Sequence, residues 1–466
     1  MSLGLDLHLD LSPVRPGRSL EAALRAAILD GRLSADTRLP AARTLAADLG
    51  ISRNTVADVY AQLAAEGWLE SRVGAGTWVS GRTPSHVRAG VRQRTVRRRW
   101  IDLRGGIPDT AGFARREWAS AARQAALDVT TAELGYPDPA GTTRLRGALT
   151  SYLARTRGVV VERERVLVGQ GFGELLVLLC RALRLRGATR IAVEEYGHDT
   201  HRRLIAATGL TPVPLAVDED GADVRALDRL DVSAVLLTPA HQFPVGVPLA
   251  ADRRRWLVGW AERAEAVVVE DDYDGEFRYD RRAIGALQSL APERVAYLGT
   301  ASKAVAPAVG LAWGVLPARL LPDVLEQRAL SGGQPSALHQ LALARFVEAH
   351  DYDRTVRRLR ATYRSRRQRL AEVVADQLPG CEVTGLAAGL QCLLTLPAGT
   401  VEEVVVREAE ARGLRLEGLG SFHISPVRRP ARPALVIGYG GPTPGQYEAA
   451  LELLVASVRS ARQGAE

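Results

Sequence analysis

Lys303 is the single lysine of this chain, in which the other 60 of the 61 lysine and arginine residues are arginines. Arginine supplies charge and phosphate contacts as well as lysine does, but it keeps its proton and cannot attack a carbonyl carbon as a free amine. A lysine kept in such a chain is therefore a candidate Schiff-base residue. The alternative is a codon bias that left one lysine by chance. The apolar run and small hydroxyl residues of Tyr297 to Ser302 favour the chemical role.

Other polar groups follow apolar runs that are typical of buried strands. Val168 is followed by a glycine-rich turn, residues 169–173, and then by a helix from Glu174; a helix that begins this way offers free backbone N–H groups to a phosphate. Val269 is followed by Glu270, Asp271, Asp272 and Tyr273. An amine, a carboxylate, hydroxyls and a phosphate-binding turn together match pyridoxal phosphate, which carries an aldehyde, a pyridine nitrogen and a phosphate.

The elements that must position these groups alternate between apolar strands and helical stretches from residue 102 onward. The runs are Val166–Val168, Ile191–Val193, Ala234–Leu237 and Val267–Val269. Continuous apolar strands separated by helices indicate a mostly parallel sheet covered on both faces, in which ligands bind at the carboxyl ends of the strands. The sequence therefore predicts an α/β domain over residues 102–466 with its site at that edge.

Residues 1–80 have a different pattern, typical of a winged helix-turn-helix of the α+β class. Helices are expected over Ser19–Asp30 and Ala41–Leu49, and a third, capped by Ser52, over residues 53–66. Two short helices joined by a tight turn, followed by strands at Trp68–Arg72 and Thr77–Val79 around a glycine turn, predict a recognition helix and a wing.

The bulk composition sets broad limits. The 466 residues allow two or three domains, and no apolar run is long enough for a transmembrane helix. Three widely spaced cysteines form neither a disulfide framework nor a metal pattern, so we expect no metal, no membrane association and a cytoplasmic location. Residues 81–101 are expected to form a basic linker, because residues 81–100 hold seven arginines and no acid.

The segment "GRLSADTRLPAARTLAADLGISRNTVADVYAQLAAEGWLESRVGAGTWV" closely resembles the GntR family of winged-helix repressors. The resemblance implies contacts with double-stranded operator DNA. The implied DNA-binding residues are Arg43, Arg53, Asn54, Thr55 and the wing residue Gly74.

The rest of the chain resembles the fold-type I aminotransferases, and specifically the MocR group, in which a GntR-type head is joined to an aminotransferase-like domain. The matching segments are Tyr136–Gly141 with Leu145 and Arg146, Thr238–Gly246 (TPAHQFPVG), Glu270–Tyr279 (EDDYDGEFRY) and Gly299–Lys303 (GTASK). The resemblance implies a homodimer with pyridoxal 5'-phosphate as cofactor.

The same resemblance implies a role for each site residue. Lys303 would form the Schiff base, Asp271 would keep the pyridine nitrogen protonated, and Tyr273 would hydrogen-bond the ring hydroxyl. The phosphate would be held by Gly171, Phe172, Thr300 and Ser302. The turn at residues 241–243 would line the ring, and His198 would stack on it.

Three positions depart from the family pattern. Gly310 stands where the family has an arginine for the cofactor phosphate, and Thr200 where amino-acid-sensing regulators have an arginine. The arginine that binds a substrate carboxylate is missing from Ala434–Gly438, and Arg432 is out of register. Loss of two such arginines argues against an ordinary α-amino acid as ligand.

These features predict a transcription regulator that senses pyridoxal phosphate itself or an amine-like small-molecule effector. An active pyridoxal phosphate-dependent aminotransferase is the alternative; it would leave the winged helix unexplained. A DNA-binding protein with a nonfunctional cofactor domain is a third hypothesis, and retention of Lys303 argues against it.

Overall fold

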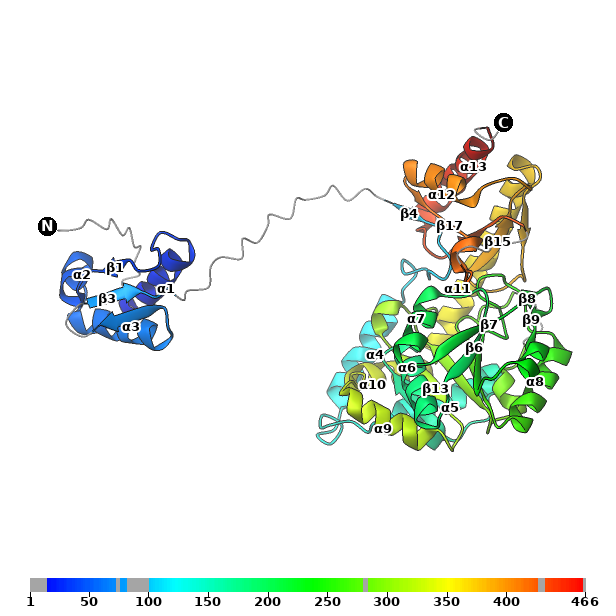
Figure 1. Ribbon diagram of the computed structural model, residues 1–466, viewed down its shortest axis with the longest axis horizontal. Coiled ribbons are helices and arrows are strands. Elements are labelled where there is room, and N and C mark those ends of the chain that lie inside the picture. The colour runs from blue at the N-terminus through cyan, green and yellow to red at the C-terminus, as the bar shows by residue number, and fades with distance from the viewer. Residues whose placement is uncertain (1–14, 73–75, 82–99, 280–283, 426–431, 464–466) are drawn as a thin grey trace. The chain divides into compact units, whose positions relative to one another are not determined.

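The computed structural model describes residues 15–72, 76–81, 100–279, 284–425 and 432–463. The chain divides into two compact units, Met1–Arg97 and Arg98–Glu466, and each is described by itself (Figure 1). Within the described ranges, no helix combines the length and the apolar content needed to cross a membrane. The predicted DNA contact Gly74 and most of the predicted basic linker, residues 82–99, lie outside the described residues.

The N-terminal unit is a winged helix. Its elements are α1 (Pro16–Leu29), β1 (Arg38–Leu39), α2 (Ala42–Leu49), α3 (Arg53–Ala65), β2 (Leu69–Arg72) and β3 (Gly76–Val79). The three strands form an antiparallel sheet in the order β1-β3-β2. The apolar faces of the three helices meet in one core that includes Leu20, Leu24 and Leu63. The backbone N–H of Thr55 donates to Ser52 Oγ at 3.0 Å, so Ser52 caps α3 as predicted.

The structure of this unit differs from the sequence prediction in one short strand and in the start of one helix. Strand β1 was not predicted, because a two-residue strand has no periodicity of its own and Pro40 reads as a helix start. Helix α1 begins three residues earlier than expected, at Pro16, where proline is well suited to the first turn.

The C-terminal unit contains a seven-stranded sheet in the order β5-β13-β12-β11-β10-β6-β7. Its strands are β5 (Val166–Gly169), β6 (Arg190–Glu194), β7 (Thr211–Leu215), β10 (Ala234–Leu237), β11 (Val267–Asp271), β12 (Val295–Thr300) and β13 (Ala312–Val315). Only β13 runs antiparallel to its neighbours, which confirms the prediction of a mostly parallel sheet.

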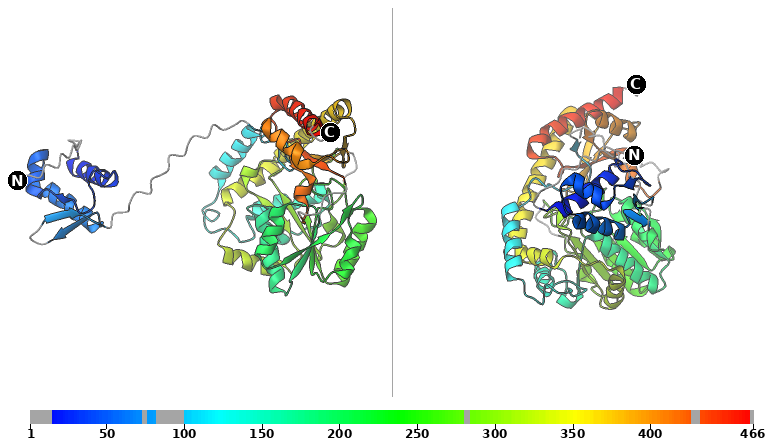
Figure 2. Two further views of the ribbon diagram at one scale, coloured as in Figure 1. Left: turned by 45° about the horizontal axis from the view of Figure 1, so that its top comes forward. Right: turned by 90° about the vertical axis from the view of Figure 1, so that its left-hand side faces the viewer.

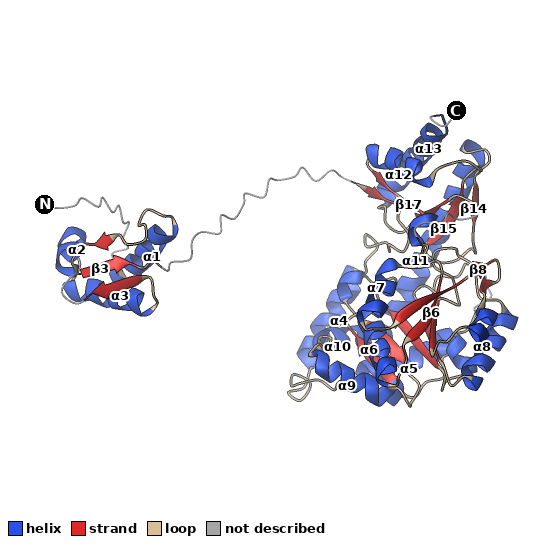
Figure 3. Ribbon diagram, viewed as in Figure 1, coloured by secondary structure: helices blue, strands red, loops and turns tan. Residues whose placement is uncertain are grey.

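Helices cover both faces of this sheet (Figure 3). They are α4 (Arg115–Asp128), α5 (Thr143–Arg157), α6 (Phe172–Leu185), α7 (Asp199–Ala207), α8 (Ala251–Arg263), α9 (Leu321–Ser331), α10 (Ala337–Glu348) and α11 (Asp351–Gln377). Alternate strand residues enter different cores: Val269 packs in the cluster that includes α6, and Val268 packs with Leu257 and Trp260 of α8. This double burial explains why the strands read as continuous apolar runs.

A smaller C-terminal part follows α11. It contains β14 (Glu382–Thr384), β15 (Gln391–Thr395), α12 (Glu402–Ala411), β16 (Leu414–Arg415), β17 (Glu417–Gly418), β18 (Ala434–Gly438) and α13 (Tyr447–Gln463), with a four-stranded sheet in the order β14-β15-β18-β17. The short strand β4 (Ile101–Asp102) pairs with β16, so the beginning of this unit lies against its end. Figure 1 shows the label of β4 beside that of β17, and in Figures 1 and 2 the orange and red C-terminal part lies at one end of the unit. A further hairpin is formed by β8 (Val217–Asp218) and β9 (Gly221–Ala222).

Candidate functional site

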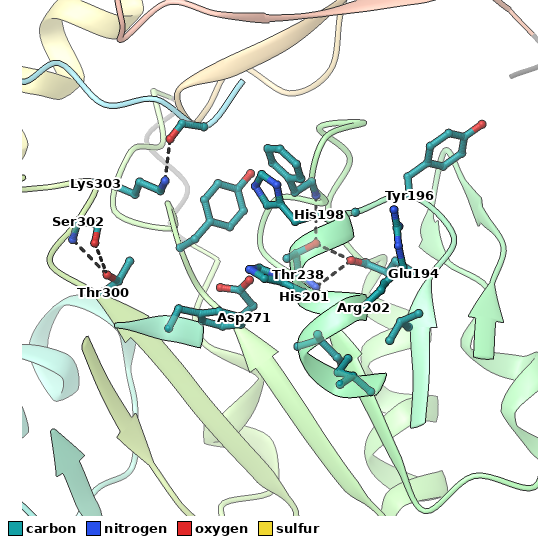
Figure 4. A pocket seen from close by; sticks show the side chains of 18 residues that line it. Glu194, Tyr196, His198, His201, Arg202, Thr238, Asp271, Thr300, Ser302 and Lys303 are labelled. Carbon is teal, nitrogen blue, oxygen red and sulfur yellow. Dashed lines mark hydrogen bonds between the residues drawn. The ribbon is translucent and has the colours of Figure 1, made fainter. Parts of the chain in front are cut away.

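A cavity of about 160 Å³ lies where β6, β10, β11 and β12 end (Figure 4). This is the edge of the sheet at which the sequence predicted a site. The lining residues are Gly106, Phe172, Val193, Glu194, Tyr196, Gly197, His198, His201, Arg202, Ile205, Leu236, Thr238, Phe243, Asp271, Tyr273, Thr300, Ser302 and Lys303. Lys303, Thr300 and Ser302 lie on one side, Glu194 and Arg202 on the other, and Asp271 between them (Figure 4).

Lys303 lies in the turn after β12, and its side chain reaches into the cavity. Its Nζ donates a hydrogen bond of 2.7 Å to the carbonyl oxygen of Gly106. Burial lowers the pKa of Lys303 below its ordinary value, although the charges of Asp271 and Asp274 oppose this effect. A lowered pKa increases the fraction of the amine that is free to attack a carbonyl carbon.

Asp271, the last residue of β11, is buried and its Oδ1 atom has no hydrogen-bond partner among the described residues. Burial raises the pKa of Asp271 well above its ordinary value, and the neighbouring Asp272 adds to the shift. A buried carboxyl oxygen that accepts no hydrogen bond raises the free energy of the folded state. This position therefore fits a ligand that supplies an N–H group.

Tyr273 lines the cavity and is supported from behind by three side chains. Gln391 Nε2 donates to the Tyr273 hydroxyl at 2.7 Å, and His241 Nδ1 lies 3.1 Å from the same oxygen. His241 Nδ1 also lies 2.7 Å from Asp274 Oδ2, so the imidazole connects the Tyr273 hydroxyl to this buried carboxyl group. Gln391 and His241 therefore hold the Tyr273 hydroxyl in place at the cavity.

The turn at residues 241–243, which the resemblance places against the cofactor ring, contributes one side chain to the cavity. Phe243 lines the cavity, whereas the His241 side chain lies behind Tyr273 and outside the lining. Gln391 was not predicted at all. Its only signal in the sequence is one amide residue at the start of the apolar strand β15.

The predicted phosphate-binding groups lie near the start of α6. Phe172, Thr300 and Ser302 line the cavity, and Gly171 is the residue before α6, where a Cβ atom would meet nothing within 4 Å. The Thr300 hydroxyl donates to Ser302 Oγ at 3.0 Å and accepts from the Ser302 N–H at 3.1 Å. Free backbone N–H groups and two hydroxyls can together hold an anion.

Gly310 has a φ of 63°, a conformation that favours glycine over arginine. A Cβ atom at Gly310 would lie 3.8 Å from the carbonyl oxygen of Gln170, which belongs to the glycine turn. An arginine at this position would therefore begin beside the phosphate-binding groups. With glycine at position 310, the phosphate-binding groups lack the guanidinium that an arginine would supply there.

Glu174 was also missed by the sequence analysis, although it stands in the first turn of α6. Its carboxylate accepts from the N–H of Gln170 at 2.6 Å and pairs with the buried Arg328 at 3.3 Å. A carboxylate in the first turn also interacts favourably with the positive end of the helix dipole.

Three residues around the start of α7 form the opposite wall. His198 stacks on Phe243 at 4.1 Å between ring centroids, and His201 packs against Phe172 at 4.6 Å. Arg202 donates to the carbonyl oxygen of Phe422 at 2.9 Å, and among the described residues it is the one arginine in the lining. His198 was predicted here, whereas Arg202 and His201 were not.

The positions that depart from the family pattern contribute nothing to the cavity lining. Thr200 is exposed on α7, and β18 brings only apolar side chains and a glycine. Arg432 is exposed and outside the lining. No group of three or more histidine, cysteine or acidic side chains suited to a metal ion occurs within the described ranges.

The carboxyl group of Glu194 should make the free energy of unfolding depend on pH. Its Oε2 accepts from the Thr238 hydroxyl at 2.6 Å, and burial raises the pKa of Glu194 to about 7. Between the ordinary value of 4.5 and about 7, the folded state binds a proton that the unfolded state has lost, so stability falls as pH rises. Over this pH range, the free energy of unfolding should fall by on the order of 2 kcal/mol less in Glu194→Gln than in the parent. Urea unfolding at several pH values measures this difference. An unchanged pH dependence in the variant would contradict the shift.

In the N-terminal unit, the predicted contacts Arg53 and Asn54 are exposed at the start of α3, and Arg43 is exposed on α2. Thr55 is half-buried, and its hydroxyl lies 2.8 Å from Ser52 Oγ. The first three side chains are thus accessible to solvent, whereas the Thr55 hydroxyl interacts with the residue that caps the helix.

Comparisons with known proteins agree with both units. Residues 16–79 match the family of bacterial regulatory proteins described as the gntR family, and residues 98–432 match aminotransferase class I and II. The pyridoxine biosynthesis regulator PdxR of Corynebacterium glutamicum is 33% identical over 90% of this chain and 91% of its own length. The probable rhizopine catabolism regulatory protein MocR of Rhizobium meliloti is also 33% identical, over 92% of this chain and 90% of its own length.

Solved structures support the fold of the larger unit. The kynurenine aminotransferase of Pyrococcus horikoshii superposes with a TM-score of 0.69 at 21% identity, covering 78% of this chain and 91% of that chain. LysN, the α-aminoadipate aminotransferase of Thermus thermophilus, gives a TM-score of 0.69 at 20% identity, covering 78% and 93%. These likenesses confirm the predicted aminotransferase-like fold.

Proposed function

The chain belongs to the MocR-type transcriptional regulators, which join a GntR winged helix to a class I and II aminotransferase domain, and from this premise we propose that its cavity binds pyridoxal phosphate through Lys303. The observation that carries the proposal is one cavity that holds both a lysine amine and the unpartnered, buried Asp271 carboxyl. We further propose that occupancy of this cavity changes the binding of operator DNA.

Pyridoxal phosphate, when bound, supplies an aldehyde carbon and a ring nitrogen that takes up a proton. Lys303 would supply the amine for the aldehyde, and its lowered pKa favours the unprotonated form. Asp271, whose Oδ1 has no partner among the described residues, would accept a hydrogen bond from the ring nitrogen and keep the proton there. Tyr273 would donate its hydroxyl hydrogen to the ring oxygen, and His198 would cover the ring.

The phosphate is assigned to the backbone N–H groups at Gly171 and Phe172 and to the hydroxyls of Thr300 and Ser302. These groups are neutral, so they provide weaker anion binding than a site with a guanidinium. We therefore expect the covalent bond through Lys303 to account for a large part of the affinity.

The effector is proposed to be pyridoxal phosphate itself or an amine that lacks an α-carboxylate. Neither Thr200 nor the β18 strand brings an arginine into the cavity, and Arg202 already donates to a backbone carbonyl. The name of the Corynebacterium glutamicum relative, a regulator of pyridoxine biosynthesis, favours the cofactor as effector. The same lack of carboxylate-binding arginines argues against an active aminotransferase, so we propose that the domain senses its ligand without turnover.

We also propose that the regulator acts as a homodimer on double-stranded DNA in the cytoplasm. The exposed apolar side chains Leu134, Tyr136 and Leu338 border one surface hollow of the larger unit. Exposed apolar residues gathered around a hollow are typical of a protein interface. Two winged helices would then read two half-sites.

Titration of the purified protein with pyridoxal phosphate, followed by visible absorption, tests the cofactor assignment. A new band that saturates at one equivalent per chain supports it. Free-cofactor absorption alone at micromolar protein and cofactor would exclude a tight covalent site.

Restoring the missing arginine should strengthen binding. Gly310→Arg places a guanidinium next to the phosphate-binding groups, and a hydrogen bond to a charged group contributes about 1.5–3 kcal/mol, or roughly ten- to a hundredfold in Kd. The same change strains a backbone with a φ of 63°, which should lower the unfolding free energy by about 1 kcal/mol. Gly310→Ala is the matched control, because it carries the strain without the cation. Equal affinities for the two variants would show that position 310 does not reach the phosphate.

A further inference from the structure

We propose that the hydrogen bond between Lys303 and Gly106 is a ligand-sensitive latch, which ties residues 103–107 over the cavity until Lys303 reacts with an aldehyde. The inference rests on the proposed function in one respect, since it takes Lys303 as the residue that reacts. In consequence, the segment that lines the cavity at Gly106 is released when the ligand binds.

The latched segment begins at β4 and ends over the cavity. The Ile101 N–H donates to the carbonyl oxygen of Gly413 and the Leu103 N–H to that of Arg415, both at 3.0 Å. Three residues after Leu103, the chain reaches Gly106, which lines the cavity. The Lys303 bond is thus separated from the β4–β16 pairing by only a few residues of continuous backbone.

Close backbone packing makes this short segment a stiff connection. A Cβ atom at Gly438 would lie 2.0 Å from the carbonyl oxygen of Arg104, and one at Gly440 would lie 2.2 Å from that of Ile107. The Gly438 N–H also donates to the carbonyl oxygen of Leu103 at 2.7 Å. The segment therefore lies directly on the backbone that leaves β18, without side chains between them.

Gly106 is positioned to be affected by a ligand. Its φ is 74°, and a Cβ atom there would lie 3.6 Å from Phe243, 3.9 Å from His198 Nε2 and 3.9 Å from Lys303 Nζ. The carbonyl group of Gly106 is thus held by Lys303 among the side chains that we assign to the cofactor ring. A molecule that fills this space competes for the same amine.

The chemistry of Lys303 explains why the latch opens. After the ammonium group loses a proton, the amine nitrogen would form a double bond to the aldehyde carbon, its two hydrogens would leave with the aldehyde oxygen as water, and the nitrogen would then take up a proton again. The nitrogen keeps one hydrogen, fixed in the plane of the new double bond, whereas the free ammonium has three donors that rotate. Lys303 therefore gives up its bond to the Gly106 carbonyl.

The two functions of Lys303, donating and reacting, can be separated by substitution. Lys303→Arg keeps a positively charged donor but cannot form the double bond, and Lys303→Ala removes both. Hydrogen exchange, read by mass spectrometry on a peptide covering residues 101–107 of the cofactor-free full-length protein, reports the state of the segment. We expect Lys303→Ala to exchange there about tenfold faster or more, and Lys303→Arg to stay close to the parent.

Saturating pyridoxal phosphate should accelerate exchange of this peptide in the parent and leave Lys303→Arg unchanged. Equal exchange in the cofactor-free parent and in Lys303→Ala would overturn the latch. Unchanged exchange in a parent that shows the visible absorption band would overturn its release by the ligand. Absence of the band would instead refute the proposed cofactor, and the cofactor-free comparison would still decide whether the latch exists.

Discussion

Replacing Lys303 with alanine should abolish the visible absorption band that pyridoxal phosphate gives with the parent protein. No other lysine is present in the chain, so no second side-chain amine can substitute for it. The remaining groups, Asp271, Tyr273 and the hydroxyls of Thr300 and Ser302, still surround the cavity. We therefore expect noncovalent binding that is weaker by at least a hundredfold, measured by calorimetry and absorption together.

Two controls make this result specific. Circular dichroism and thermal unfolding of Lys303→Ala should resemble those of the parent, because Lys303 makes one hydrogen bond and no ion pair shorter than 4 Å among the described contacts. Asp271→Asn should keep a covalent band but shift it, since an amide cannot hold the proton on the ring nitrogen. A full band in Lys303→Ala would show that the cofactor binds elsewhere.

The second large effect is expected in the winged helix. Arg53 and Asn54 are exposed in the first turn of α3, where a recognition helix contacts base edges and phosphates. Removing both side chains in a double alanine variant should weaken DNA binding by roughly ten- to a hundredfold, since one good base contact contributes about 1–3 kcal/mol. The measurement is fluorescence anisotropy on DNA that the parent protein selects from a random pool.

Arg32→Ala is the matched control for this loss of charge. Arg32 is exposed in the same unit but lies between α1 and β1, outside the helix-turn-helix, and pairs with Asp30 at 3.5 Å. Its removal should change affinity less than threefold, and cofactor absorption should remain unchanged in every one of these variants. Similar losses for Arg32→Ala and for the double variant would indicate nonspecific attraction to DNA.

The sequence predicted most of the fold because its local signals agreed with one another. Apolar strands separated by helices indicated the parallel sheet, and a capped helix after a glycine turn indicated the winged helix. The comparisons confirm both classes. The two-residue strands β1, β4 and β16 could not be predicted, because their pairing depends on residues far away in the chain.

Some residues of the candidate site could be predicted from the sequence, and others could not. Lys303, Asp271 and Tyr273 lie at the ends of strands or shortly after them and carry distinctive chemistry. Their positions could therefore be predicted, and the structure places all three around one cavity. Gln391 comes from a strand of the small C-terminal sheet, more than a hundred positions after Tyr273. Gly106 acts through its backbone carbonyl, which no side chain marks in the sequence. Both assignments needed three-dimensional contacts.

We propose that a ligand on Lys303 controls DNA binding by the winged helix. The most direct test measures the affinity of the full-length protein for its selected DNA with and without pyridoxal phosphate, in the parent and in Lys303→Arg. We predict that the cofactor changes the affinity of the parent at least severalfold and leaves that of Lys303→Arg unchanged. An affinity that does not respond to the cofactor in the parent, at concentrations that saturate the absorption band, would contradict the claim.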